Sequence, residues 1–173
     1  MSPDDKRDPL DRLVDAYENM LERVDEMLDK AEKTTLPTLR KSLEQARDKA
    51  VELNELTREE AERVSDYLER DMQDAAQFLS QTGSEFRNWL QFDLRLMEAR
   101  MLDMFANVAD RTRVELGKLA ENARNASLYR TGEITGPGTL VCTGCGKALH
   151  FHKTGHIPPC GICHGTVFKR HRE

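Results

Sequence analysis

Most of the chain before residue 127 carries apolar residues spaced alternately three and four positions apart. From Leu10 to Ala31 this spacing is uninterrupted, as in the heptad repeat of helices that pack against one another. Asp8 and Pro9 form a typical helix start, because aspartate caps the first turn and proline suits the first helical position. The pattern therefore predicts a first amphipathic helix that begins at Pro9.

A second helical region follows a break at residues 34–38, where Pro37 interrupts the pattern. The apolar spacing resumes at Leu39 and continues to Leu79. Thr57 and the glutamate three positions later form a capping-box sequence, which is typical of a helix start. The pattern leaves open whether residues 38–80 form one helix or two.

A turn at residues 81–84, which contains Gly83, separates this region from a long final helix. We expect that helix to run from about residue 85 to about residue 126, roughly 60 Å. It is the most hydrophobic part of the chain, so we place it at the centre of the bundle. Its methionines fit either a core or an adaptable partner surface, and we favour the core. They are Met97, Met101 and Met104.

Composition supports helices with a single apolar stripe. Charged residues make up 33% of the 173 residues, hydrophobic residues 38% and aromatic residues only 6%. No apolar run approaches the roughly 20 residues of a membrane span, and the first residues lack the apolar stretch of a signal peptide. We therefore expect a cytoplasmic location, where thiols stay reduced.

The only four cysteines form two C-x-x-C pairs, Cys142 with Cys145 and Cys160 with Cys163, which are fourteen residues apart. Two residues between paired cysteines let one tight turn aim both sulfurs at a single point, and a second such turn completes a tetrahedron. This spacing predicts one structural Zn²⁺ with four cysteine ligands and no open coordination position. Iron in the same tetrahedron is the chemical alternative.

Other interpretations of the cysteines fit less well. Cys160 to His164 matches the C-x-x-C-H pattern of haem attachment, but that chemistry requires export. A thioredoxin-like dithiol requires a βαβ context that the pattern does not predict. Histidines His150, His152 and His156 accompany His164 in this region, but four cysteines already complete the site, so we expect the histidines at the surface or around it.

Net charge divides along the chain. The total is −5, but residues 140–173 hold five Lys or Arg against one acidic residue, which leaves a formal −9 on the rest. Four thiolates around Zn²⁺ reduce the C-terminal excess to about +2. Nucleic acid is therefore a possible ligand of the C-terminal region, with Phe151 or Phe168 available for stacking. The candidate contact residues are Lys147, Lys153, Lys169, Arg170 and Arg172.

The segment from Gly132 through Cys145-Gly146 resembles the linker and first cysteine turn of a bacterial zinc-ribbon family, the YbeL-like proteins. The acidic helical region is also similar, including Leu56-Thr57-Arg58-Glu59-Glu60. The resemblance implies a helical N-terminal region, a C-terminal ribbon and the four cysteines as ligands, and it implies no particular activity. His164 departs from it, because many ribbons have glycine there.

Together these patterns predict a mainly α fold: an elongated antiparallel helical bundle or coiled coil followed by a small C-terminal β zinc ribbon. Glycines and Pro137 mark the boundary, although Ile134, Leu140 and Val141 could alternate as strand residues. The expected division is a disordered N-terminus (1–8), a helical domain (9–127), a linker (128–139) and the ribbon (140–173).

For function, we expect a zinc-stabilised interaction or regulatory protein, adaptor-like, with a helical scaffold and a ribbon that docks a protein partner. Nucleic-acid binding through the ribbon is the alternative. Sustained heptads also permit homo-oligomers through the helices. We expect no enzyme, because the sequence has no phosphate-binding glycine loop, no nucleophile elbow and no open metal site, and we expect no membrane partner.

Overall fold

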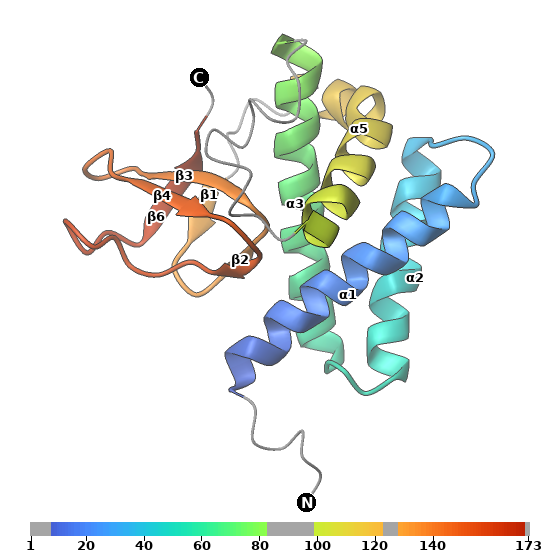
Figure 1. Cartoon of the computed structure of the whole chain (residues 1–173), viewed down its shortest axis with the longest axis horizontal. Coiled ribbons are helices and arrows are strands. Elements are labelled where there is room, and N and C mark those ends of the chain that lie inside the picture. Colours follow the sequence, from blue (N-terminus) through green and yellow to red (C-terminus); the bar gives the residue numbers. More distant parts are fainter. Residues whose placement is uncertain (1–7, 83–98, 123–127, 172–173) are drawn as a thin grey trace, which may run out of the picture.

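The computed structural model describes residues 8–82, 99–122 and 128–171 (Figure 1). In these ranges four helices precede a small antiparallel sheet, which confirms the predicted fold class. The helices are α1 (Pro9–Asp29), α2 (Leu36–Glu52), α3 (Arg58–Thr82) and α5 (Ala99–Asn122). No helix in the described part of the chain is long and apolar enough to cross a membrane.

The helix starts follow the capping signals of the sequence. Asp8 accepts a hydrogen bond from the Leu10 N–H at 3.0 Å, and Pro9 begins α1. Thr57 and Glu60 form the predicted capping box, in which each side chain accepts from the other residue's N–H, at 3.2 and 2.9 Å. That box starts α3, so residues 38–80 belong to two helices.

The break before α2 lies earlier than the sequence suggested. Thr35 caps α2, and Pro37 lies in the first turn of that helix, where its missing N–H costs nothing. At residues 81–84, Gln81 and Thr82 continue α3, while Gly83 and Ser84 lie outside the described residues.

The helical core fills the space between the four helices. In α1 the buried stripe begins only at Ala16 and Tyr17, and Leu10 remains 49% exposed. The expected final helix is described only as α5, because residues 85–98 and 123–126, with Met97, lie outside the described ranges. Met101 is buried and Met104 packs against the core, as favoured. Thr112 is buried too, and its hydroxyl donates to the Val108 carbonyl at 2.7 Å.

Six short strands follow the helices. They are β1 (Leu128–Arg130), β2 (Ile134–Thr135), β3 (Gly138–Cys142), β4 (Ala148–Phe151), β5 (Gly155–His156) and β6 (Val167–Arg170). Four of them form one antiparallel sheet in the order β1-β6-β3-β4, while β2 and β5 pair separately. Residues 128–139, which we expected to be a linker, therefore contain β1, β2 and the start of β3, because Tyr129 is buried in the ribbon core and Ile134 against the helices.

The sheet lies beside α3 (Figure 1), and the ribbon also contacts α5, where the Thr154 hydroxyl lies 3.8 Å from the Met101 sulfur. It has its own small core, formed by Tyr129, Leu140, Cys142, Ile157, Cys160 and Phe168. Ile134 of β2 is buried instead in the helical core. The two cores are thus separate, and they are joined by Ile134, by the close approach of Gly136 to Phe105, and by the polar contacts described below.

Candidate metal centre and its attachment to the helices

Two turns of the same backbone shape present the four cysteines. The Gly146 N–H donates to the Cys142 carbonyl at 2.9 Å, and the His164 N–H donates to the Cys160 carbonyl at the same distance. Both closing residues are left-handed, with φ of 75° at Gly146 and 57° at His164. The histidine that departs from the usual glycine therefore adopts the glycine conformation, and the second turn keeps the shape of the first.

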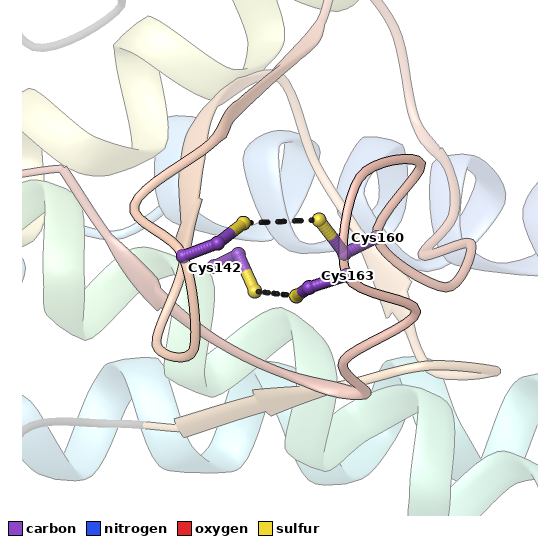
Figure 2. A group of neighbouring side chains, drawn as sticks. Cys142, Cys160 and Cys163 are labelled. Atoms are coloured by element: carbon purple, nitrogen blue, oxygen red, sulfur yellow. Dashed lines mark hydrogen bonds between the residues drawn. The ribbon is translucent and has the colours of Figure 1, made fainter.

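The four sulfurs converge on one point. All four Sγ atoms lie within 4.8 Å of one another, and the Cys142–Cys163 and Cys145–Cys160 pairs are 3.5 Å apart (Figure 2). A tetrahedron with Zn–S bonds of about 2.3 Å has sulfur–sulfur edges of about 3.8 Å. The arrangement therefore fits one four-coordinate Zn²⁺ with no open position. Cys142 and Cys160 are buried, while Cys145 and Cys163 are exposed.

Backbone donors prepare the sulfurs for a cation. The N–H groups of Cys163 and Ile162 point at the Cys160 sulfur and lower its pKa to about 6. The Gly165 N–H lowers the pKa of Cys163, but hydrogen bonds with the Cys145 and Cys142 thiols outweigh it and raise that pKa to about 12. Four thiols this close cannot all ionise without a cation among them.

Gly165 packs closely against two of the sulfurs. A Cβ atom at Gly165 would lie 3.2 Å from the sulfurs of both Cys142 and Cys163. The histidines lie outside the sulfur cluster: among the described residues, this cluster contains cysteines alone. His156, for example, has its two ring nitrogens 3.2 and 3.0 Å from the carbonyl oxygens of Gly132 and Leu10.

The predicted basic contact residues differ in how far they are exposed. Lys147, Lys153 and Lys169 are exposed. Arg170 is 3% exposed and points inward, so its side chain has almost no surface with which to contact nucleic acid. It lies two positions after Phe168 in β6, and alternate residues of a strand share a face, so this pattern could have placed Arg170 on the core side. Arg172 lies outside the described residues.

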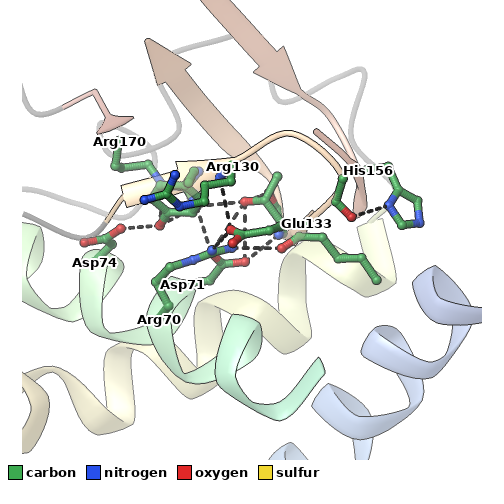
Figure 3. A network of polar contacts seen from close by, with 12 residues as sticks. Arg70, Asp71, Asp74, Arg130, Glu133, His156 and Arg170 are labelled. Carbon is green, nitrogen blue, oxygen red and sulfur yellow. Dashed lines mark hydrogen bonds and ion pairs between the residues drawn. The ribbon is translucent and has the colours of Figure 1, made fainter. Parts of the chain in front are cut away.

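Asp71 of α3 is at the centre of a buried polar network between the helices and the ribbon (Figure 3). Its Oδ2 accepts hydrogen bonds from the Tyr17 hydroxyl of α1 at 2.7 Å and from the Gly136 N–H at 2.6 Å. Its Oδ1 lies 3.2 Å from Nη2 of Arg170. One carboxylate therefore connects two helices, the β2–β3 connection and the last strand.

Arg170 extends the network within the ribbon. Its Nη2 donates to the Tyr129 hydroxyl at 3.2 Å and to the Thr135 hydroxyl at 3.1 Å. The Tyr129 hydroxyl in turn donates to Asp74, one turn after Asp71 on α3. All of these side chains are buried, so each hydrogen bond replaces water that the group loses on folding.

Arg70 makes the outer part of the same network. Its Nη1 is 2.5 Å from Glu133, and its Nη2 donates to the Ile134 carbonyl at 2.9 Å. The guanidinium carbon also lies 3.9 Å from the centre of the Tyr129 ring, at cation–π distance. Two neighbouring α3 residues, Arg70 and Asp71, thus contact β1, β2 and β6.

Gly136 permits this close approach. A Cβ atom there would lie 2.7 Å from the Phe105 ring and 2.8 Å from the Tyr17 hydroxyl. No sequence signal pointed to Asp71 or Asp74, because charged residues on a helix usually indicate a solvated face. Their role depends on what packs over that face.

A small antiparallel sheet with four cysteines that converge from two turns is the arrangement of a zinc ribbon, so the chain falls in the class of zinc-ribbon proteins. The chain belongs to the family described as "zinc-ribbon containing domain", which its residues 26–172 match. Its curated relatives include "Uncharacterized protein YbeL" of Escherichia coli K12 and of Escherichia coli O157:H7. Each is 26% identical over 132 residues, which cover 74% of this chain and 79% of the relative. No solved structure gives a significant match.

Proposed function

We propose that this chain is a zinc-stabilised interaction protein, in which the helices hold the ribbon in one orientation and the ribbon docks a protein partner. The observation that carries the proposal is the two-sided ribbon. Its inner face is fixed to α3 by Asp71 and Arg170, while Leu128, Arg130 and Lys169 are exposed on the other face of the sheet. A rigidly held open face lowers the ordering cost of binding.

The four-cysteine site supports this role because it is structural. Four sulfur ligands fill the tetrahedron, so the metal shapes the ribbon and offers no position for a substrate. A ribbon this small depends on its metal for folding. The surface with which it binds a partner should therefore form only when zinc is bound.

The test is affinity isolation of the tagged full chain from cells at native abundance, with and without a chelator. We expect a reproducible protein partner that chelation releases and that the Cys142→Ser/Cys145→Ser variant does not retain. A Lys41→Ala variant, altered at an exposed position of α2, is the matched control. Recovery of no reproducible partner, or of the same partner by the cysteine variant, contradicts the proposal.

Nucleic-acid binding is the second candidate, supported by one observation. Residues 138–171 contain no acidic residue, and the exposed lysines Lys147, Lys153 and Lys169 lie among them. Burial of Phe168 and Arg170 speaks against it, because it removes a stacking ring and a cation. Fluorescence anisotropy with short oligonucleotides at low and high salt tests this candidate. Nucleic-acid binding through the lysines requires that the affinity for the oligonucleotide falls as the salt concentration rises.

A further inference from the structure

The outer face of the four-stranded sheet carries a continuous row of side chains. Strand register places Leu128, Lys169, Val141 and Ala148 side by side across β1, β6, β3 and β4. Directly opposed residues of antiparallel strands share a face, so these four point the same way. Tyr129, Phe168 and Arg170 alternate with them and point to the inner face, toward the ribbon core and α3.

This face is both apolar and basic. Leu128 is 48% exposed, and Val141 and Ala148 are partly exposed. Lys169 is exposed at the centre of the row, and Arg130, opposite Val167 in the next row, is exposed as well. Arg130 was not among the basic residues singled out from the sequence, because it precedes the predicted ribbon.

The four strands of the sheet contain no acidic residue. Between residues 128 and 171 the only acidic residue is Glu133, whose carboxylate pairs with Arg70 of α3 and also accepts a hydrogen bond from the Arg130 N–H at 3.1 Å. The metal ligand in β3, Cys142, is opposite Phe168 and also belongs to the inner face. Among the described residues of the four strands, the outer face therefore carries two basic side chains beside apolar ones and no acidic one.

The size of the face limits what it can bind. Three spacings between strands of about 4.8 Å make it about 14 Å wide, and strands of three to five residues make it about 10–16 Å long. The resulting area of about 200 Å² is well below the roughly 800 Å² per partner of a standard protein interface. One helix, about 10–12 Å across, covers it.

We propose that the outer face of the sheet, formed by Leu128, Arg130, Val141, Ala148, Val167 and Lys169, docks a short acidic amphipathic helix of a protein partner. This inference rests on the proposed function and names the class of partner. Glutamates at the edges of such a helix meet Arg130 and Lys169, while its apolar stripe covers Leu128 and Val141. Nucleic acid suits the face less well, because Tyr129 and Phe168 are fully buried and Phe151, which is partly buried, packs against the ribbon core.

The experiment titrates the ¹⁵N-labelled, zinc-loaded full chain with a synthetic peptide of about 14 residues that has leucine on one face and glutamate beside it. Amide shifts are expected in β1, β6 and β3. The Arg130→Glu/Lys169→Glu variant should bind at least about tenfold more weakly, since each reversal replaces an attraction by a repulsion. Both side chains are exposed, so this variant should keep the wild-type spectrum elsewhere.

Two controls make the result specific. Lys153→Glu reverses an exposed charge in the bend between β4 and β5, away from the face, and should change the affinity less than about twofold. A peptide with glutamine at every glutamate position should bind much more weakly than the acidic one.

The inference is overturned if the glutamine peptide binds equally well, if Lys153→Glu weakens binding as much as the double reversal, or if the shifts map to the helices. It is also overturned if oligothymidylate of matched charge binds this face more tightly than the peptide. An isolated partner that the cysteine variant loses and the double reversal retains would refute this inference alone and leave the proposed function in place.

Discussion

Each cysteine turn is closed by a residue in the left-handed conformation. That residue is Gly146 in the first turn and His164 in the second. A side chain at positive φ costs about 1–2 kcal/mol, because Cβ crowds the following carbonyl, although histidine tolerates it better than branched residues do. His164, at φ 57°, therefore carries strain that Gly146 avoids.

We expect His164→Gly to raise the free energy of unfolding of the zinc-loaded protein by about 0.5–1 kcal/mol, less than the full strain because glycine also gains freedom in the unfolded chain. The matched change in the other turn, Gly146→Val, should lower it by about 1–3 kcal/mol. Denaturant unfolding measures both. A clear loss of stability in His164→Gly would show that the imidazole makes a contact worth more than the strain.

Gly136 is required for a different reason, the close approach of the ribbon backbone to α1 and α5. Gly136→Ala places a methyl group within 3 Å of Phe105 and Tyr17, so we expect a loss of about 1–3 kcal/mol in unfolding free energy. Gly161→Ala is the control, since a Cβ atom there meets nothing within 4 Å. Equal effects in the two variants would contradict the packing described for Gly136.

Tyr17 and Tyr129 make the folded protein less stable at alkaline pH. Burial, as the largest cause, raises the pKa of each hydroxyl well above its usual value near 10. The folded state favours the protonated form, so the resulting stability is complete below pH 10 and is lost as pH rises toward the higher folded pKa. Urea unfolding at pH 8 and 10.5 should show this fall, and Tyr17→Phe should reduce its steepness.

At the scale of elements, the ion pair of Asp71 with Arg170 joins α3 to β6, the strand that follows the second cysteine turn. Such a buried pair adds little net stability over apolar side chains of the same shape, but removing one partner leaves a buried charge. We therefore interpret the network as a device that fixes the orientation of the ribbon on the helices, because Asp71 and Arg170 stay paired in this orientation.

Arg170→Met should lower the free energy of unfolding by about 3–5 kcal/mol, because Asp71 loses its partner from β6. The double variant Arg170→Met/Asp71→Asn should lose less unfolding free energy than the two single variants lose together. We expect the difference to be at least about 1 kcal/mol. Denaturant unfolding of the four proteins closes the cycle. Strictly additive losses would show that the two side chains do not act as a pair.

For the whole molecule, two nearly separate cores imply two steps of unfolding. Metal binding contributes about 10 kcal/mol or more to the folding of small zinc modules, whereas the helical core contains no metal ligand. Chelation should therefore unfold the ribbon and leave the helices folded.

Amide hydrogen exchange measures this directly. After chelation, protection should be lost at Leu140 and Phe168 and retained at Leu68 and Val24, because the first two lie in the ribbon core and the others in the helical core. Simultaneous loss of protection in both regions would show that docking makes the protein a single cooperative unit.

Local signals in the sequence were sufficient for the starts of α1 and α3 and for the metal ligands. Asp8, Thr57 and Glu60 form caps through neighbouring backbone groups, and two C-x-x-C turns present sulfurs wherever they occur. These features depend on residues within a few positions of one another, so a linear pattern contains them.

The place of the ribbon required the tertiary structure. Asp71 and Arg170 are 99 residues apart, and each by itself looks like an ordinary surface charge. Their burial depends on α3 and β6 meeting, and the same meeting turns the expected linker into strands. The sequence thus determined the helices and the zinc site through local chemistry, whereas the folded chain alone decided which charges are buried and which face of the ribbon remains open.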